Sequence, residues 1–122
     1  MEEERPPEIL QARFEDLLVD ENAREEYVLS TGKKVVLRKL TTKDIRDITR
    51  LSKDDAITYA MYMVARGVVE PSMSPAQVEK LKPPLMFEIA NAVARFSNMD
   101  AGSLRKAGFL PPQTPEEEES GL

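Results

Sequence analysis

Residues 27–51 read YVLSTGKKVVLRKLTTKDIRDITRL, and this stretch decides the fold. Two β-prone runs, residues 27–29 and 35–37, flank a short polar turn. Within that turn Gly32 can adopt a positive φ, as a tight hairpin often requires. The stretch therefore predicts a β-hairpin of about residues 26–40. Because an isolated hairpin is marginally stable, it must pack on helices or pair with another strand.

A capped amphipathic helix should follow the hairpin directly. Thr41 is a good N-cap, and Asp44 can complete a capping box and interact well with the positive end of the helix. The buried stripe of this helix would be Ile45, Ile48 and Leu51. Asp47 lies on the same helix and is expected on its solvated face.

Most of the remaining compact region reads as helix. Ser52 and the acidic pair after it should start a second helix, and Gly67 is placed to end that helix as its C′ residue. Ser74 and Pro75 should open a short third helix, and a final helix is expected over residues 85–97. The predicted fold class is mainly α (α+β), a small helical bundle with one N-terminal β-hairpin.

A further helix is predicted before the hairpin, where apolar residues recur at i, i+4, i+7 and i+8. These residues are Leu10, Phe14, Leu17 and Leu18. We expect this helix to pack on the core, and docking on a partner is the alternative. The single domain would then span residues 8–97, between a disordered acidic leader (1–7) and a flexible acidic tail (98–122).

Composition is that of a soluble protein of the cytoplasm. The net charge is −5, but glutamates near both ends account for it and leave a nearly neutral body. Cysteine is absent, so we expect neither disulfides nor thiolate metal sites. No apolar run reaches the roughly 20 residues that a membrane span needs, and the acidic N-terminus is unlike a signal peptide.

The residue types that usually carry catalysis are missing. The chain has no histidine, no glycine-rich phosphate loop and no EF-hand spacing. We therefore expect a binding protein rather than an enzyme, without catalytic residues, cofactor or metal site.

Basic residues cluster between the hairpin turn and the helix that follows it. They are Lys33, Lys34, Arg38, Lys39, Lys43, Arg46 and Arg50. This basic cluster could contact phosphates, but Asp44 and Asp47 interrupt it, and it has no aromatic residue for base stacking. A solvated face, or a site for an acidic partner, is favoured over nucleic acid binding.

Two helical stretches, residues 54–66 and 85–97, are apolar on more than one side. A helix that is apolar nearly all round is normally buried, so these are either the central helices of the bundle or are covered by another subunit or a client. For the second case the candidate protein-binding residues are Tyr59, Tyr62, Met63, Phe87, Ala90 and Ala94. Methionine repacks around varied partners, and the methionines suited to such an adaptable surface are Met61, Met63, Met73 and Met86.

The order of elements forms a recognisable pattern. A Ser-Thr-Gly turn leads into the basic and apolar stretch GKKVVLRKLTTKDI, and the helical pair after it is followed by Val69-Glu70-Pro71 and Ser74-Pro75. Residues 27–97 thereby resemble the tail assembly chaperones of long-tailed bacteriophages and related small proteins of baseplate-hub and tape-measure assembly. The chain departs from that pattern by its additional N-terminal helix and its acidic tail.

This resemblance implies a non-enzymatic chaperone of the host cytoplasm. Such a protein binds and solubilises the tape-measure protein, helps tail-tube subunits to assemble around it, leaves before the virion is finished, and often forms homo-oligomers. Two alternatives stay open. One is a structural tail or baseplate component that remains in the particle, and the other is a small nucleic-acid-binding regulator that uses the basic cluster.

Overall fold

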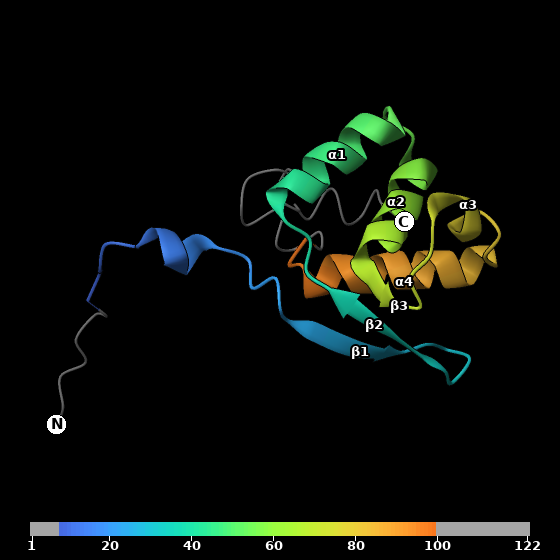
Figure 1. The fold of residues 1–122 in the computed structure, drawn as a ribbon, viewed down its shortest axis with the longest axis horizontal. Coiled ribbons are helices and arrows are strands. Elements are labelled where there is room, and N and C mark those ends of the chain that lie inside the picture. The colour runs from blue at the N-terminus through green and yellow to red at the C-terminus, as the bar shows by residue number, and fades with distance from the viewer. Residues whose placement is uncertain (1–7, 100–122) are drawn as a thin grey trace, which may run out of the picture.

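The computed structural model describes residues 8–99, and it has an α+β fold in which helices predominate, as predicted (Figure 1). The acidic leader (1–7) and the tail from residue 100 onward lie outside the described residues. The elements in order are a 3-10 helix η1 (Phe14–Leu17), β1 (Arg24–Val28), β2 (Lys34–Arg38), α1 (Thr42–Ser52), α2 (Ala56–Gly67), β3 (Val68–Glu70), α3 (Pro75–Val78) and α4 (Pro83–Phe96).

The predicted hairpin is confirmed, and it belongs to a three-stranded antiparallel sheet in the order β1-β2-β3. Tyr27 pairs with Val35, and Gly32 has the positive φ, +91°, that the turn needs. The third strand was not predicted. It pairs with the other edge of β2, where Leu37 lies opposite Val68 and Val36 opposite Glu70, so β2 becomes the central strand and its Leu37 is fully buried.

The capping box of α1 is also confirmed. The Thr41 hydroxyl accepts the N–H of Asp44 at 3.2 Å, and the Asp44 carboxylate accepts the N–H of Thr41 at 2.8 Å. In the predicted stripe Ile48 is fully buried and Ile45 half-buried, whereas Leu51 is 43% exposed. Leu51 lies in the last turn of the helix, where it adds little to the core.

The second helix begins later than predicted. Ser52 is the last residue of α1, and Asp55 caps α2 by accepting the N–H of Thr58. Lys53 and Asp54 both have positive φ, at 49° and 68°, and these two left-handed residues break the helical path between α1 and α2.

Gly67 does not end α2 as a left-handed C′ residue; it is the last residue of the helix, and β3 follows at once. Glycine is needed here for close packing. A Cβ at this position would lie 2.5 Å and 2.7 Å from the two methyl carbons of the buried Val93 on α4. The missing side chain thus lets α2 and α4 approach each other closely.

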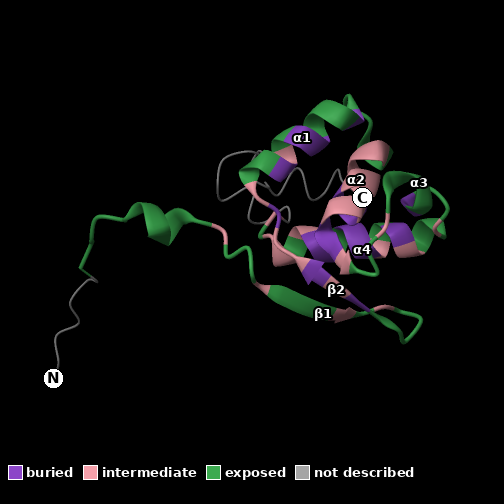
Figure 2. Cartoon of the chain, viewed as in Figure 1, coloured by how far each residue is buried: buried purple, intermediate pink, exposed green. Residues whose placement is uncertain are grey.

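The core lies between the sheet and helices α2 and α4 (Figure 2). Helix α4, predicted to start at residue 85, begins at Pro83, and α3 has the predicted Ser74 cap with Pro75 in its first turn. The buried residues of α4 recur mainly at helical spacing and form the largest contribution of any single element: Met86, Ile89, Ala90, Ala92 and Val93.

Residues 8–18, which we call the N-terminal arm, do not pack on the core, contrary to the prediction. The arm runs away from the folded part, and only the single turn η1 is helical (Figure 1). Its large apolar side chains are 56–95% exposed: Ile9, Leu10, Phe14, Leu17 and Leu18. A helix this short is marginal in water without a packing partner, which explains why the helical pattern is largely unrealised.

Side chains of α4 hold the hairpin in place. The Glu88 carboxylate accepts hydrogen bonds from the Tyr27 hydroxyl at 3.1 Å, the Ser30 N–H at 3.0 Å and the Ser30 hydroxyl at 2.9 Å. At the other end of α4, the Ser97 hydroxyl accepts the N–H of Leu40 at 2.9 Å. Both ends of the hairpin segment are therefore tied to the last helix of the described fold.

Candidate protein-binding groove

An apolar groove lies where α2, α3 and the start of α4 meet. Two proline-containing helix starts build it, because Pro75 begins α3 and Pro83 begins α4 only a few residues later. The fully buried Val78 anchors α3 to the core. The groove is lined by Ile57, Met61, Val78, Glu79, Leu81, Pro83, Met86 and Phe87.

The rim of this groove exposes large apolar side chains from two helices. Ile57 on α2 is 56% exposed and Phe87 on α4 is 41% exposed. Met61 and Met86 also belong to the lining, and Glu79 is its one charged member. Apolar side chains that gather at a concave surface are typical of protein-binding sites, and unbranched methionines can adapt to different partners.

The structure does not bring the six predicted site residues together on one surface. Phe87 lies in the groove, but Met63 and Ala90 are buried in the core. Tyr59, Tyr62 and Ala94 are half-buried and pack against that core. The reason is that α2 contacts both α1 and α4, so most of its second apolar face is covered within the chain.

Helical periodicity alone did not identify Ile57 as exposed. Helical spacing places Ile57 on the same face of α2 as Val64, which is fully buried. Ile57, however, lies in the first turn of α2, where fewer neighbouring elements cover the helix. Two of the four methionines suited to an adaptable surface, Met61 and Met86, line the groove, but Met86 is itself buried in the core.

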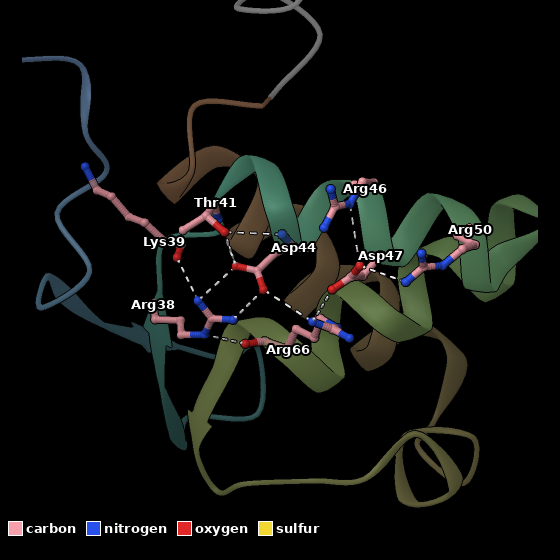
Figure 3. Close-up of polar contacts among 8 residues, drawn as sticks. All are labelled: Arg38, Lys39, Thr41, Asp44, Arg46, Asp47, Arg50 and Arg66. Carbon is pink, nitrogen blue, oxygen red and sulfur yellow. Dashed lines mark hydrogen bonds and ion pairs between the residues drawn. The ribbon is translucent and has the colours of Figure 1, made fainter. Parts of the chain in front are cut away.

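Apart from the apolar groove, a network of ion pairs joins β2, α1 and α2 (Figure 3). Arg38 donates two hydrogen bonds of 3.1 Å to the Asp44 carboxylate, and its Nε donates to the Arg66 carbonyl at 2.8 Å. The Arg66 guanidinium lies 3.4 Å from Asp44 and 3.5 Å from Asp47. These contacts fix the position of α1 against the sheet and α2, so their role is structural.

Asp47 belongs to this network. The prediction that Asp47 lies on the solvated face of the helix is therefore wrong. Asp47 is buried, and its carboxylate pairs with Arg50 at 3.0 Å and lies 3.9 Å from Arg46. Only the guanidinium side chains of Arg46 and Arg50 are well exposed. Burying a carboxylate is costly unless it is paired, and the three arginines around Asp47 supply that pairing.

The environment of Asp44 lowers its pKa. Burial by itself raises the pKa of this carboxyl, but hydrogen bonds from Arg38 and from the N–H and hydroxyl of Thr41 outweigh burial and hold the pKa at about 2, below the ordinary 3.8. The folded state therefore favours the ionised form of the Asp44 carboxyl more strongly than the unfolded state does.

We expect acid to weaken the fold through Asp44. Its contribution of about 2 kcal/mol is complete above about pH 5 and is lost as the pH falls through about 4 to 2, because the unfolded chain takes up the proton first. Urea unfolding at pH 7 and at pH 2.5 would measure this for the wild type and for Asp44→Asn. The stability difference between the two proteins should shrink at pH 2.5, and a constant difference would contradict the assignment.

The basic cluster is partly neutralised within the chain. Lys34 pairs with Glu26 at 2.9 Å, and Arg38, Arg46 and Arg50 belong to the network of Asp44 and Asp47. Lys39 lies over the ring of Phe96, 5.2 Å from its centroid. The ion pairs reduce the positive charge that the cluster offers to phosphates, whereas the ring contact of Lys39 leaves the charge of Lys39 in place.

Within residues 8–99 no three acidic side chains come close enough together to hold a metal ion. In the same part of the chain, no helix has both the length and the apolar character that crossing a membrane demands. Comparison of this chain with protein-family models, with curated proteins and with solved structures yields no match.

Proposed function

We propose that this chain is a tail assembly chaperone of a long-tailed bacteriophage, which binds the tape-measure protein in the host cytoplasm without catalysing a reaction. Two observations support the proposal. The first is the pattern of residues 27–97, with its hairpin, capped helix and proline-led helices. The second, which carries it furthest, is the apolar groove with exposed Ile57 and Phe87.

The groove suits the side chains of an amphipathic helix. Tape-measure proteins are long and helical, and an apolar stripe on such a helix could lie against Ile57 and Phe87 while Met61 and Met86 repack beneath it. Covering that stripe would keep the client soluble until tail-tube subunits assemble around it. Most of the groove's affinity would come from its few exposed apolar residues, as is usual for protein interfaces.

We expect Phe87→Asp to abolish solubilisation of the tape-measure protein encoded beside this chain. A charge in the groove removes an apolar contact of about 1.5–3 kcal/mol, which corresponds to a loss of affinity of at least about tenfold. The measurement is the soluble fraction of the tape-measure protein after co-expression with each variant. Ile57→Asp should behave in the same way.

Leu51→Asp is the matched control, because Leu51 is exposed to a similar degree but lies on α1, away from the groove. It should solubilise the client as well as the wild type does. Equal loss in the control, or unchanged solubility with Phe87→Asp, would contradict a role for the groove. If the wild type leaves client solubility unchanged, the chaperone proposal fails.

The two other functions give different results in simple tests. A structural tail or baseplate component would be found in finished particles at a fixed stoichiometry, whereas a chaperone would be missing from them. A nucleic-acid-binding regulator would bind with steep salt dependence. The ion pairs of Lys34, Arg38, Arg46 and Arg50 make that function less favourable than protein binding.

A further inference from the structure

The exposed side of α1 carries a row of cations. Lys43, Arg46 and Arg50 recur at i, i+3 and i+7, so they share one face of the helix, and all three are exposed. We call these three residues the basic face. We infer that the basic face binds an acidic segment, and that its occupant is the glutamate run of this chain's own tail, residues 116–119.

The buried acids of α1 do not cancel the charge of this face. Four arginines contact the carboxylates of Asp44 and Asp47: Arg38, Arg46, Arg50 and Arg66. Positive charge is therefore in excess even before Lys43, which forms no ion pair within residues 8–99. The side chains of Arg46 and Arg50 are 68% and 70% exposed, and a guanidinium has five N–H donors. Both can bind a further carboxylate while they contact Asp47 (Figure 3).

The described chain ends beside the start of α1. The Ser97 hydroxyl accepts the N–H of Leu40, which directly precedes the Thr41 cap of this helix, and Figure 1 shows the end of α4 below the start of α1. Glu116 is seventeen positions after Met99, and such a segment can span at most about 55 Å. The basic face is only about 10 Å long. The glutamate run can therefore reach all of it.

The glutamate run matches the basic face in charge and in length. Residues 116–119 are four consecutive glutamates, which in extended form span about 13 Å. Attachment to the same chain gives the run an effective concentration at the face of about a millimolar. At low salt, where charges attract each other over about 30 Å, this attachment and the opposite charges act together.

Other acidic residues of the chain fit the basic face less well. Glu21 lines a surface hollow together with Lys43, but it supplies a single charge and forms no ion pair with Lys43 among the described residues. The leader has three glutamates, residues 2–4, and the directly following Arg5 offsets part of their charge. The glutamate run of the tail is the longer of the two and is followed by no cation.

A spin label in the tail tests the inference by nuclear magnetic resonance. The chain has no cysteine, so Ser120→Cys gives a single labelling site directly after the glutamate run. In the full chain at low salt, the label should broaden the amide resonances of residues 43–50 and leave those of residues 80–82 sharp. The second region is a matched control, because Lys80 and Lys82 are also exposed cations but lie at the opposite end of α4 from residue 99.

Three changes should each remove the broadening. The first replaces all four glutamates of residues 116–119 with glutamine. The second is Lys43→Gln/Arg46→Gln, which leaves the closer pairs of Asp47 with Arg50, at 3.0 Å, and with Arg66, at 3.5 Å, in place. The third is roughly 0.5 M salt, which screens exposed charges. Dispersed amide resonances would show that each variant is folded.

The leader provides the control for the identity of the occupant. Replacing the glutamates of residues 2–4 with glutamine should leave the broadening unchanged. Broadening that persists without the glutamates of the tail would overturn the inference, and so would equal broadening of residues 43–50 and 80–82. Loss of the broadening in the leader variant alone would assign the basic face to the leader and overturn the role of the tail.

An added peptide tests the basic face without the tail. Hexaglutamate at low salt should shift the amide resonances of residues 43–50 in the variant whose tail glutamates are glutamines. The wild type should need several-fold more peptide for the same shift, because its own glutamate run competes. A variant whose resonances do not shift would overturn the basic face as a site for acidic segments. Neither measurement involves the groove or the tape-measure protein, so the outcome is independent of the proposed function.

Discussion

Replacing Gly67 with alanine should lower the free energy of unfolding by about 3 kcal/mol. The new methyl group would lie 2.5 Å from a methyl carbon of Val93 and 3.1 Å from its Cβ. Val93 is fully buried and β-branched, so its side chain has no alternative rotamer into which it can move freely. Relief therefore requires α2 and α4 to move apart, which loosens the centre of the core. Urea unfolding followed by circular dichroism would measure the change.

A second substitution identifies the cause of that loss. Val93→Ala alone should destabilise the protein by about 2 kcal/mol, because it leaves a small cavity. Combined with Gly67→Ala, it should cost clearly less than the two single effects together, since the space it vacates accepts the new methyl group. Strictly additive losses would show that the short distance to Val93 is not the source of the effect.

Asp44→Ala should destabilise the protein by about 3 kcal/mol at neutral pH. The substitution removes one partner of a half-buried ion pair, so the Arg38 guanidinium keeps only carbonyl acceptors. It also removes the capping-box carboxylate of α1, a contact with Thr41 that usually contributes about 1 kcal/mol. Thermal and urea unfolding of the purified variant would measure the loss.

Glu26→Ala is the matched control for this prediction. It breaks an ion pair of similar length, 2.9 Å to Lys34, but both of its side chains are more than half exposed. Water and salt screen such a pair, so we expect a change below about 0.5 kcal/mol. Equal losses in the two variants would contradict the view that burial and the shared contacts of Asp44 make its pairs important.

Local signals in the sequence predicted the local parts of the fold well. The hairpin turn at Gly32, the capping box of Thr41 and Asp44 and the Ser74 cap depend on residues a few positions apart. Their geometry is set by backbone preferences and short-range hydrogen bonds, which can be read directly from residue types. For the same reason the α+β fold with predominant helices was predictable.

The parts that were missed depend on residues far apart in the chain. Strand β3 has only three residues and exists because β2 offers it a free edge. Asp47 is buried because Arg66, nineteen positions away, lies beside it. The groove combines side chains of three helices, and helical periodicity does not say which neighbour covers which face.

The hydrogen bonds of Glu88 and Ser97 have a consequence for the order in which the protein can form during synthesis. The hairpin leaves the ribosome early, yet the carboxylate and hydroxyl that hold it, together with much of the core, belong to α4 and to Ser97, the residue that follows this helix. A nascent chain that stops before this helix has the three-stranded sheet and helices α1 to α3, which lack the main helix they pack against. We therefore expect the domain to fold only once residue 97 has emerged, so that its earlier segments stay open to proteases and to other newly made proteins until then.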